Sequence, residues 1–68
     1  MCGTEFLGRR VRVRPTADSE QGRLHAGKYG EIEQQLGTLE EGLRGYYVRL
    51  DDGETISLKP HEVEILTH

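Results

Sequence analysis

The chain has 68 residues and a mass of 7.7 kDa, which leaves room for one small domain. Nine basic residues stand against twelve acidic ones, for a formal net charge of −3, and 34% of the residues are hydrophobic. A chain of this size buries only about 60% of its unfolded surface, so a thin core is expected and a large catalytic cleft is not. No run of about 18 apolar residues is present, which argues against a membrane-spanning helix.

Cysteine use and the first residues indicate the compartment. Cys2 is the single cysteine, so a disulfide framework is excluded. The N-terminal stretch does not combine the basic, apolar and small-residue regions of a secretory signal. We therefore expect a cytoplasmic protein with one domain over residues 1–68, ordered from about residue 7 to about residue 66.

The first half of the chain predicts two strands. In the segment Leu7–Arg14, Leu7, Val11 and Val13 alternate with polar residues, which is typical of a half-buried strand. Residues 16–28 read as a long polar loop in which Leu24 is a possible anchor. The segment Tyr29–Leu36 predicts the second strand.

The second strand has an irregularity. Ile32 and Leu36 are expected to face the core, and Gln35 to face outward with the glutamates. Gln34 then falls on the inner side, so it lies at the rim of the sheet or the strand bulges there. The following stretch 37–45 is expected to be a loop that packs Leu39 and Leu43 over the end of the barrel.

The third and fourth strands form the clearest hairpin. Tyr46, Val48 and Leu50 alternate before the Asp51-Asp52-Gly53 turn, and two apolar residues alternate after it. A three-residue loop keeps the apolar residues of both strands on one side, whereas a two-residue loop does not. We therefore expect Gly53 at the left-handed position of the loop. The apolar residues after the turn are Ile56 and Leu58.

The last segment predicts a tight turn and a short strand. Residues 59–62 contain Pro60 and suit a single 3₁₀ turn. Alternation resumes at Val63 and ends at Ile65. The chain thus predicts an all-β fold, a single small SH3-like barrel of about five short strands with a tight 3₁₀ turn before the last one. An OB-type barrel is the alternative.

Two stretches resemble SH3-like domains of the KOW type. The first joins the alternating segment Arg10–Arg14 to the glycine-flanked turn Gly27–Ile32. The second joins Tyr47–Leu50 and the acidic turn to the closing segment Leu58–Glu64. The resemblance covers most of residues 9–66. It implies a small barrel that binds RNA or protein, or an accessory subunit like those of photosystem I and ferredoxin–thioredoxin reductase.

One candidate binding surface is a row of arginines on the outer face of the first strand, here called the arginine strip. It consists of Arg10, Arg12 and Arg14. Arginines about 6.6 Å apart suit phosphate or carboxylate groups of a partner. The alternative is a solvated strand face neutralised by acidic residues of neighbouring strands. The acidic candidates are Glu31, Glu33 and Glu64.

A second candidate surface lies on the predicted hairpin. Tyr47 and Arg49 face outward there, and Tyr29 is on the outer side of the second strand. Exposed tyrosine and arginine are enriched among residues that dominate protein interfaces. The alternative is that the rings lie over their neighbours and have no partner.

Three functions remain open. The first, which the small size and acidic balance favour, is a non-enzymatic docking module or accessory subunit that binds a larger protein. The second is a nucleic-acid contact that adds Arg23 and Lys28 to the arginine strip, although a pI near 5.5 weighs against it. The third is an enzyme formed only by oligomerisation.

Sequence spacing gives no support for metal binding, a cofactor or catalysis. The histidines at 25, 61 and 68 lack partners at the spacings that zinc motifs use. No nucleophile elbow, phosphate-binding loop or Cys–His pair is present. We therefore expect no metal, no cofactor and no enzymatic activity.

Overall fold

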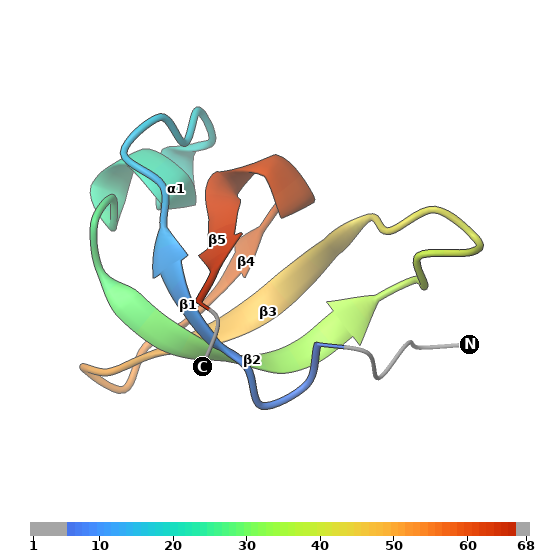
Figure 1. Cartoon of the computed structure of the whole chain (residues 1–68). Coiled ribbons are helices and arrows are strands. Elements are labelled where there is room, and N and C mark those ends of the chain that lie inside the picture. Colours follow the sequence, from blue (N-terminus) through green and yellow to red (C-terminus); the bar gives the residue numbers. More distant parts are fainter. Residues whose placement is uncertain (1–5, 67–68) are drawn as a thin grey trace.

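The computed structural model describes residues 6–66 and contains five strands in one antiparallel sheet (Figure 1). The strand order is β4-β3-β2-β1-β5, so β4 and β5 lie at opposite ends of the order and are not paired with each other. The predicted all-β fold is confirmed. Within residues 6–66, no helix is long and apolar enough to cross a membrane. In chain order the elements are β1 (Arg10–Val13), α1 (Glu20–Leu24), β2 (Tyr29–Leu36), β3 (Gly45–Leu50), β4 (Thr55–Leu58), η1 (Pro60–Glu62) and β5 (Val63–Ile65).

The core follows from the alternation of apolar and polar residues along each strand. Its buried members come from all five strands and from the segment after β1. Leu7 is not among them. It lies in a turn before β1 and is 42% exposed. Gly8 has φ 79°, in the left-handed region, and interrupts the extended backbone between Leu7 and β1, so the predicted alternation does not reach Leu7. The buried hydrophobic residues are Val11, Val13, Ala17, Ile32, Tyr46, Val48, Leu50, Ile56, Leu58 and Val63.

The β3–β4 hairpin is as predicted. Val48 pairs with Ile56, and Tyr46 pairs with Leu58. The three-residue loop is closed by a hydrogen bond of 2.7 Å from the backbone N–H of Leu50 to the carbonyl oxygen of Glu54. Gly53 has φ 97°, which is the left-handed conformation that the loop requires.

The irregularity in β2 is a bulge between Ile32 and Gln34. The extra residue reverses the alternation beyond it, so that Gln35 is fully buried and Leu36 is only half-buried. The prediction that Gln35 faces outward is therefore wrong. Its side chain accepts a hydrogen bond from the N–H of Phe6 and donates one to the carbonyl of Gly37, both at 3.0 Å. These bonds satisfy a polar side chain inside the core.

The long segment after β1 contains a short helix that the sequence analysis did not predict. Ser19 begins α1, and its Oγ accepts a hydrogen bond of 3.0 Å from the N–H of Gly22. The predicted anchor Leu24 is 70% exposed. The segment is instead held by buried Ala17 and His25, because the helix turns Leu24 toward solvent.

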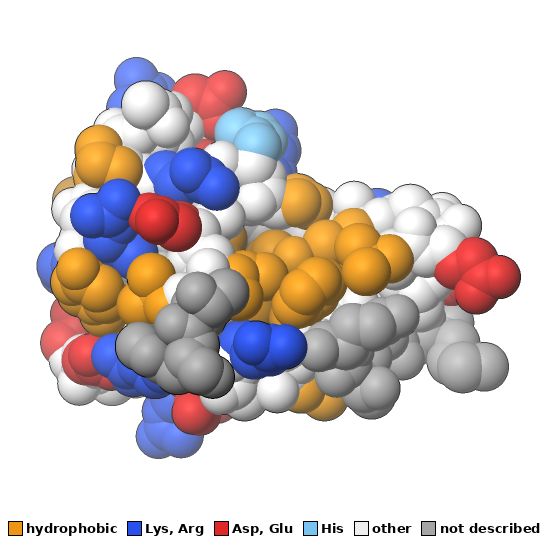
Figure 2. Space-filling view, in the orientation of Figure 1, with side chains coloured by type: hydrophobic (Ala, Val, Ile, Leu, Met, Phe, Trp, Pro, Cys, Tyr) orange, Lys and Arg blue, Asp and Glu red, His pale blue; other side chains and the backbone are white. Residues whose placement is uncertain are grey.

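The β2–β3 connection forms an arm that extends from the body of the molecule (Figure 1). Leu43 is half-buried and packs against the core, as predicted, but Leu39 is 62% exposed and does not cover the barrel. Figure 2 shows hydrophobic side chains gathered in a band that continues toward the arm. Phe6, which is half-buried, meets the ring of Tyr46 edge-on with the ring centroids 6.0 Å apart.

The predicted 3₁₀ turn is present as η1 and brings a carboxylate into the core. Glu62 has no exposed surface. Its Oε1 accepts a hydrogen bond of 2.9 Å from the N–H of Lys59, and its Oε2 accepts one of 2.7 Å from the N–H of Ser19. Burial by itself would raise the pKa of Glu62, but the hydrogen bonds from Ser19 and Lys59 outweigh it and the pKa is lowered.

Glu62→Gln should lower the free energy of unfolding by about 1.5–3 kcal/mol at pH 7. A glutamine has only one oxygen, so one of the two backbone N–H groups would face an NH2 donor in place of a carboxylate oxygen. A carboxylate whose pKa is lowered by folding contributes stability above its unfolded pKa of about 4.3 and loses it as the pH falls through the folded value. The difference between wild type and variant should therefore shrink in acid. Urea unfolding at pH 7 and in acid measures it, with half-buried Glu64→Gln as the control. Equal stability at pH 7 would contradict this role of Glu62.

Candidate functional site

The outer face of the sheet brings together the residues that the sequence analysis singled out on β1 and β3. Arg10 of β1 is paired with Glu31 of β2, and Glu31 is paired in turn with Arg49 of β3. Further along β1, Arg12 lies opposite Tyr29 of β2. The outer face therefore carries alternating positive and negative side chains rather than one continuous positive surface.

Two arginines of the strip are held by acidic partners. Arg10 donates hydrogen bonds of 2.9 Å to both carboxylate oxygens of Asp51, which raises the pKa of Arg10 and lowers that of Asp51. Arg12 forms a hydrogen-bonded ion pair with Glu64 of β5. Because these charges are paired within the molecule, Arg10 and Arg12 have less to offer a phosphate group.

Arg14 differs from the other two. It lies just beyond the end of β1, where its backbone N–H donates to the carbonyl oxygen of Glu62 at 2.8 Å. Its side chain is exposed, and within residues 6–66 no acidic group forms an ion pair with it. The structure therefore separates Arg14 from the paired part of the strip.

The hairpin face is the outer surface of β3 and β4, consisting of Tyr47, Arg49, Thr55 and Ser57. Tyr47 is opposite Ser57 and Arg49 is opposite Thr55, so both long side chains stand beside short ones. Tyr47 is 38% exposed, and the Arg49 side chain is 65% exposed with Glu33 3.8 Å away. This face leaves an aromatic ring and a positive charge accessible to a partner.

The residues of the nucleic-acid hypothesis are spread over β1 and the segment between β1 and β2. Lys28 lies beside the end of β1, since its carbonyl accepts the N–H of Val13 at 2.9 Å, but its ammonium is 3.2 Å from a carboxylate oxygen of Asp52. Arg23 is exposed on α1, and no ion pair or hydrogen bond connects its side chain to the strip within residues 6–66.

One end of the sheet has a small hollow that the sequence did not reveal. It has a volume of about 220 Å³ and is lined by residues at the start of β2 and just before it, at the end of β3, and in the turn after β3. Tyr29 forms part of it and is 45% exposed. A hollow of this size accommodates one side chain of a partner and is below the usual volume of a pocket for a small-molecule ligand, roughly 300 Å³ or more. The lining residues are Lys28, Tyr29, Leu50, Asp51 and Asp52.

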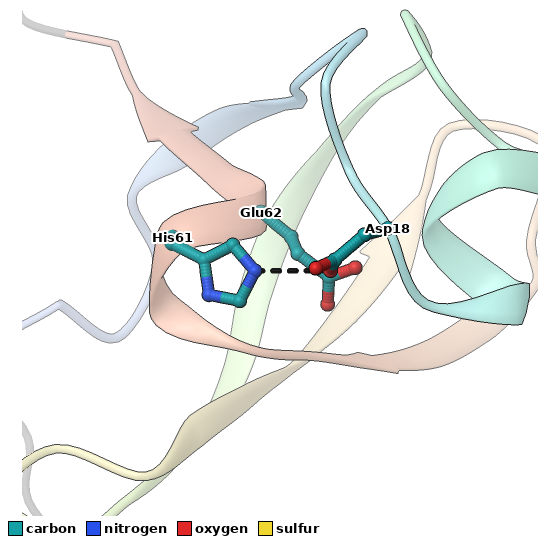
Figure 3. Close-up of side chains that lie close together, drawn as sticks. All are labelled: Asp18, His61 and Glu62. Carbon is teal, nitrogen blue, oxygen red and sulfur yellow. Dashed lines mark hydrogen bonds and ion pairs between the residues drawn. The ribbon is translucent and has the colours of Figure 1, made fainter.

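Two clusters combine histidine with carboxylates. In the first, His61 lies 3.0 Å from Asp18 and close to Glu62 (Figure 3). The hydrogen bond with His61 lowers the pKa of Asp18. In the second, buried His25 is 3.4 Å from Glu54, and Asp52 is near both. Sequence spacing could not show either cluster, because the members come from segments far apart in the chain.

Glu62 did have a signal in the sequence. It stands three residues after Lys59, at the position from which a glutamate caps the start of a turn, and Pro60 marks that start. The sequence held no signal that His25 would be buried, because its burial depends on how α1 packs.

These features define a small all-β domain with a polar outer face. Comparison with protein-family models gave no match, and comparison with curated proteins gave none either. Among solved structures, the fold is similar to that of the cyanobacterial cytochrome b6f complex subunit PetP, determined in solution, with a TM-score of 0.68 and 26% sequence identity. The match covers 93% of this chain and 81% of the PetP chain, so the likeness extends over nearly the whole domain.

The pairing of Arg10, Arg12 and Lys28 predicts weak contact with nucleic acid. Amide shifts of the labelled chain, titrated with short RNA and duplex DNA, should move at low salt and return to their free positions at physiological salt, since few phosphate contacts remain available. Shifts that persist at physiological salt over the segments Arg10–Arg14 and Arg23–Lys28 would contradict this expectation. A random acidic peptide is the control.

Proposed function

We propose that this protein is a non-enzymatic accessory subunit that docks onto a larger protein assembly on the cytoplasmic side of a membrane. The observation that carries the proposal is the similarity of the whole domain to PetP, a subunit of the cytochrome b6f complex. The net charge of −3 is compatible with a protein partner and unfavourable for nucleic acid. A multi-subunit electron-transfer complex of the cytochrome b6f kind is the partner we propose.

The hairpin face is the docking surface that we propose. Tyr47 and Arg49 are adjacent on the same side of β3, and both are partly exposed. Tyrosine and arginine are over-represented among the side chains that contribute most to binding, because each combines a large contact area with a polar group. The arginine strip is the less favourable surface, since Arg10 and Arg12 are hydrogen-bonded to acidic partners, whereas Glu33 lies 3.8 Å from Arg49, beyond hydrogen-bond distance.

Assembly is tested by affinity capture of the tagged chain from detergent-solubilised membranes of its own organism. We expect the chain to co-migrate in a native gel with a multi-subunit complex that has the absorbance spectrum of a cytochrome. A chain that migrates only as the free 7.7 kDa protein, in membranes that contain the intact complex, would contradict the proposal.

The docking surface is tested by the double variant Tyr47→Ala/Arg49→Ala. If these residues are hot spots worth about 2 kcal/mol or more together, capture should weaken by roughly tenfold or more. The matched control is Arg23→Ala/Leu24→Ala, which removes one cation and one exposed apolar side chain from α1. Unchanged capture by the first variant, or equal losses in both, would exclude the hairpin face while leaving assembly itself intact.

A further inference from the structure

We propose that His25, Asp52 and Glu54 form a binding site for a divalent transition-metal ion, with zinc as the ion that fits. The site lies where the segment following α1 meets the turn between β3 and β4, beside the small hollow. It joins His25 to two carboxylates that follow it by 27 and 29 positions in the chain, so only the fold brings the histidine to them.

The spacing of the three ligand atoms suits a metal ion. One atom from each side chain lies within 4.8 Å of the other two. Nε2 of His25 and Oε2 of Glu54 are 3.4 Å apart. That distance is long for an N–H···O hydrogen bond, usually about 2.7–3.2 Å. It matches the separation of about 3.4 Å between two ligands that bind one tetrahedral zinc ion with bonds of about 2.0–2.2 Å.

The burial of His25 fixes the position of the ligand atom that it offers. The residue is only 4% exposed, and its Nδ1 has no hydrogen-bond partner among residues 6–66. The nitrogen without a partner is not the one that faces Glu54, so a metal ion on Nε2 would leave Nδ1 as it is. Burial supplies position instead, because packing already holds the ring with Nε2 toward Glu54.

Asp52 is prepared for the same role. Its Oδ1 accepts a hydrogen bond of 3.0 Å from the N–H of Glu54, which fixes the carboxylate at the tip of the turn. A carboxylate that accepts one hydrogen bond still has lone pairs for a cation.

Lys28 occupies the position of a competing cation. Its ammonium is 3.2 Å from Oδ2 of Asp52, and its side chain is 47% exposed. The flexible lysine can move into solvent when a divalent ion approaches, because no buried contact holds it. The affinity should be moderate, since Lys28 must be displaced and Nδ1 of His25 lacks the hydrogen-bond acceptor that strong zinc sites provide.

The cluster of Asp18, His61 and Glu62 is a natural control. Both oxygens of Glu62 accept hydrogen bonds from backbone N–H groups and the side chain is fully buried, so these bonds hold it in the core. This leaves only an exposed histidine and one aspartate for a metal.

The ligand set selects the kind of ion. One imidazole and two carboxylates, with positions left for water, suit zinc and related transition metals. Magnesium and calcium prefer sites made only of oxygen ligands.

The test is a titration of the isotope-labelled chain with zinc chloride, followed through amide and histidine-ring signals, with magnesium chloride as the control ion. Zinc should give saturable shifts centred on His25 and the β3–β4 turn, and magnesium should not. Glu54→Gln changes a side chain that is 63% exposed, so it should fold normally, and it should weaken zinc binding by roughly tenfold or more. Lys28→Gln should strengthen binding, because the competing ammonium is gone.

Two results would overturn the site. One is the absence of saturable zinc shifts at His25 up to millimolar concentration. The other is zinc binding that Glu54→Gln leaves unchanged but His61→Gln abolishes, which would assign the ion to the cluster in Figure 3. His61→Gln is the matched histidine control and should leave binding at His25 unchanged.

Discussion

A carboxylate in the middle of so small a core would destabilise it unless its charge were compensated. Glu62 is compensated by backbone N–H groups from two segments, at Ser19 and Lys59. Its own carbonyl accepts the N–H of Arg14. The residue thus ties the segment after β1 to the 3₁₀ turn before β5. Gly22 belongs to the same arrangement, since a Cβ there would lie 2.6 Å from Oε2 of Glu62.

Much of the fold could be read from local patterns, because each pattern has one physical meaning. Val48 and Ile56 share a face only if the turn between them has three residues, so their register followed from parity alone. The errors occurred where the outcome depends on contacts between distant segments. The exposure of Leu24 follows from a five-residue helix too short to have a periodic signal. The burial of Gln35 follows from the bulge near Gln34, which the sequence suggested as one of two alternatives but could not distinguish from a position at the rim.

The candidate site divides in the same way. Alternation was enough to place Tyr47 and Arg49 side by side on the outer face. It could not show that Arg10 pairs with Asp51, because Asp51 lies in the turn after β3, and β2 separates β3 from β1 in the sheet. The same limit hid the neighbours of His25. The charge counted along the chain therefore overstated the positive surface, since the fold places an acidic group beside four of the basic residues predicted to act.

The bulge in β2 shifts by one residue which side chains of the strand face the core. Before the bulge, Ile32 faces the core. Beyond it, Gln35 is the buried residue and is hydrogen-bonded to Phe6 and Gly37, and the arm follows after β2. Residues added around exposed Leu39 would lengthen the arm without shifting a residue of the core. The arm is thus a segment whose reach can diverge between related proteins, or be re-engineered, while the body stays the same.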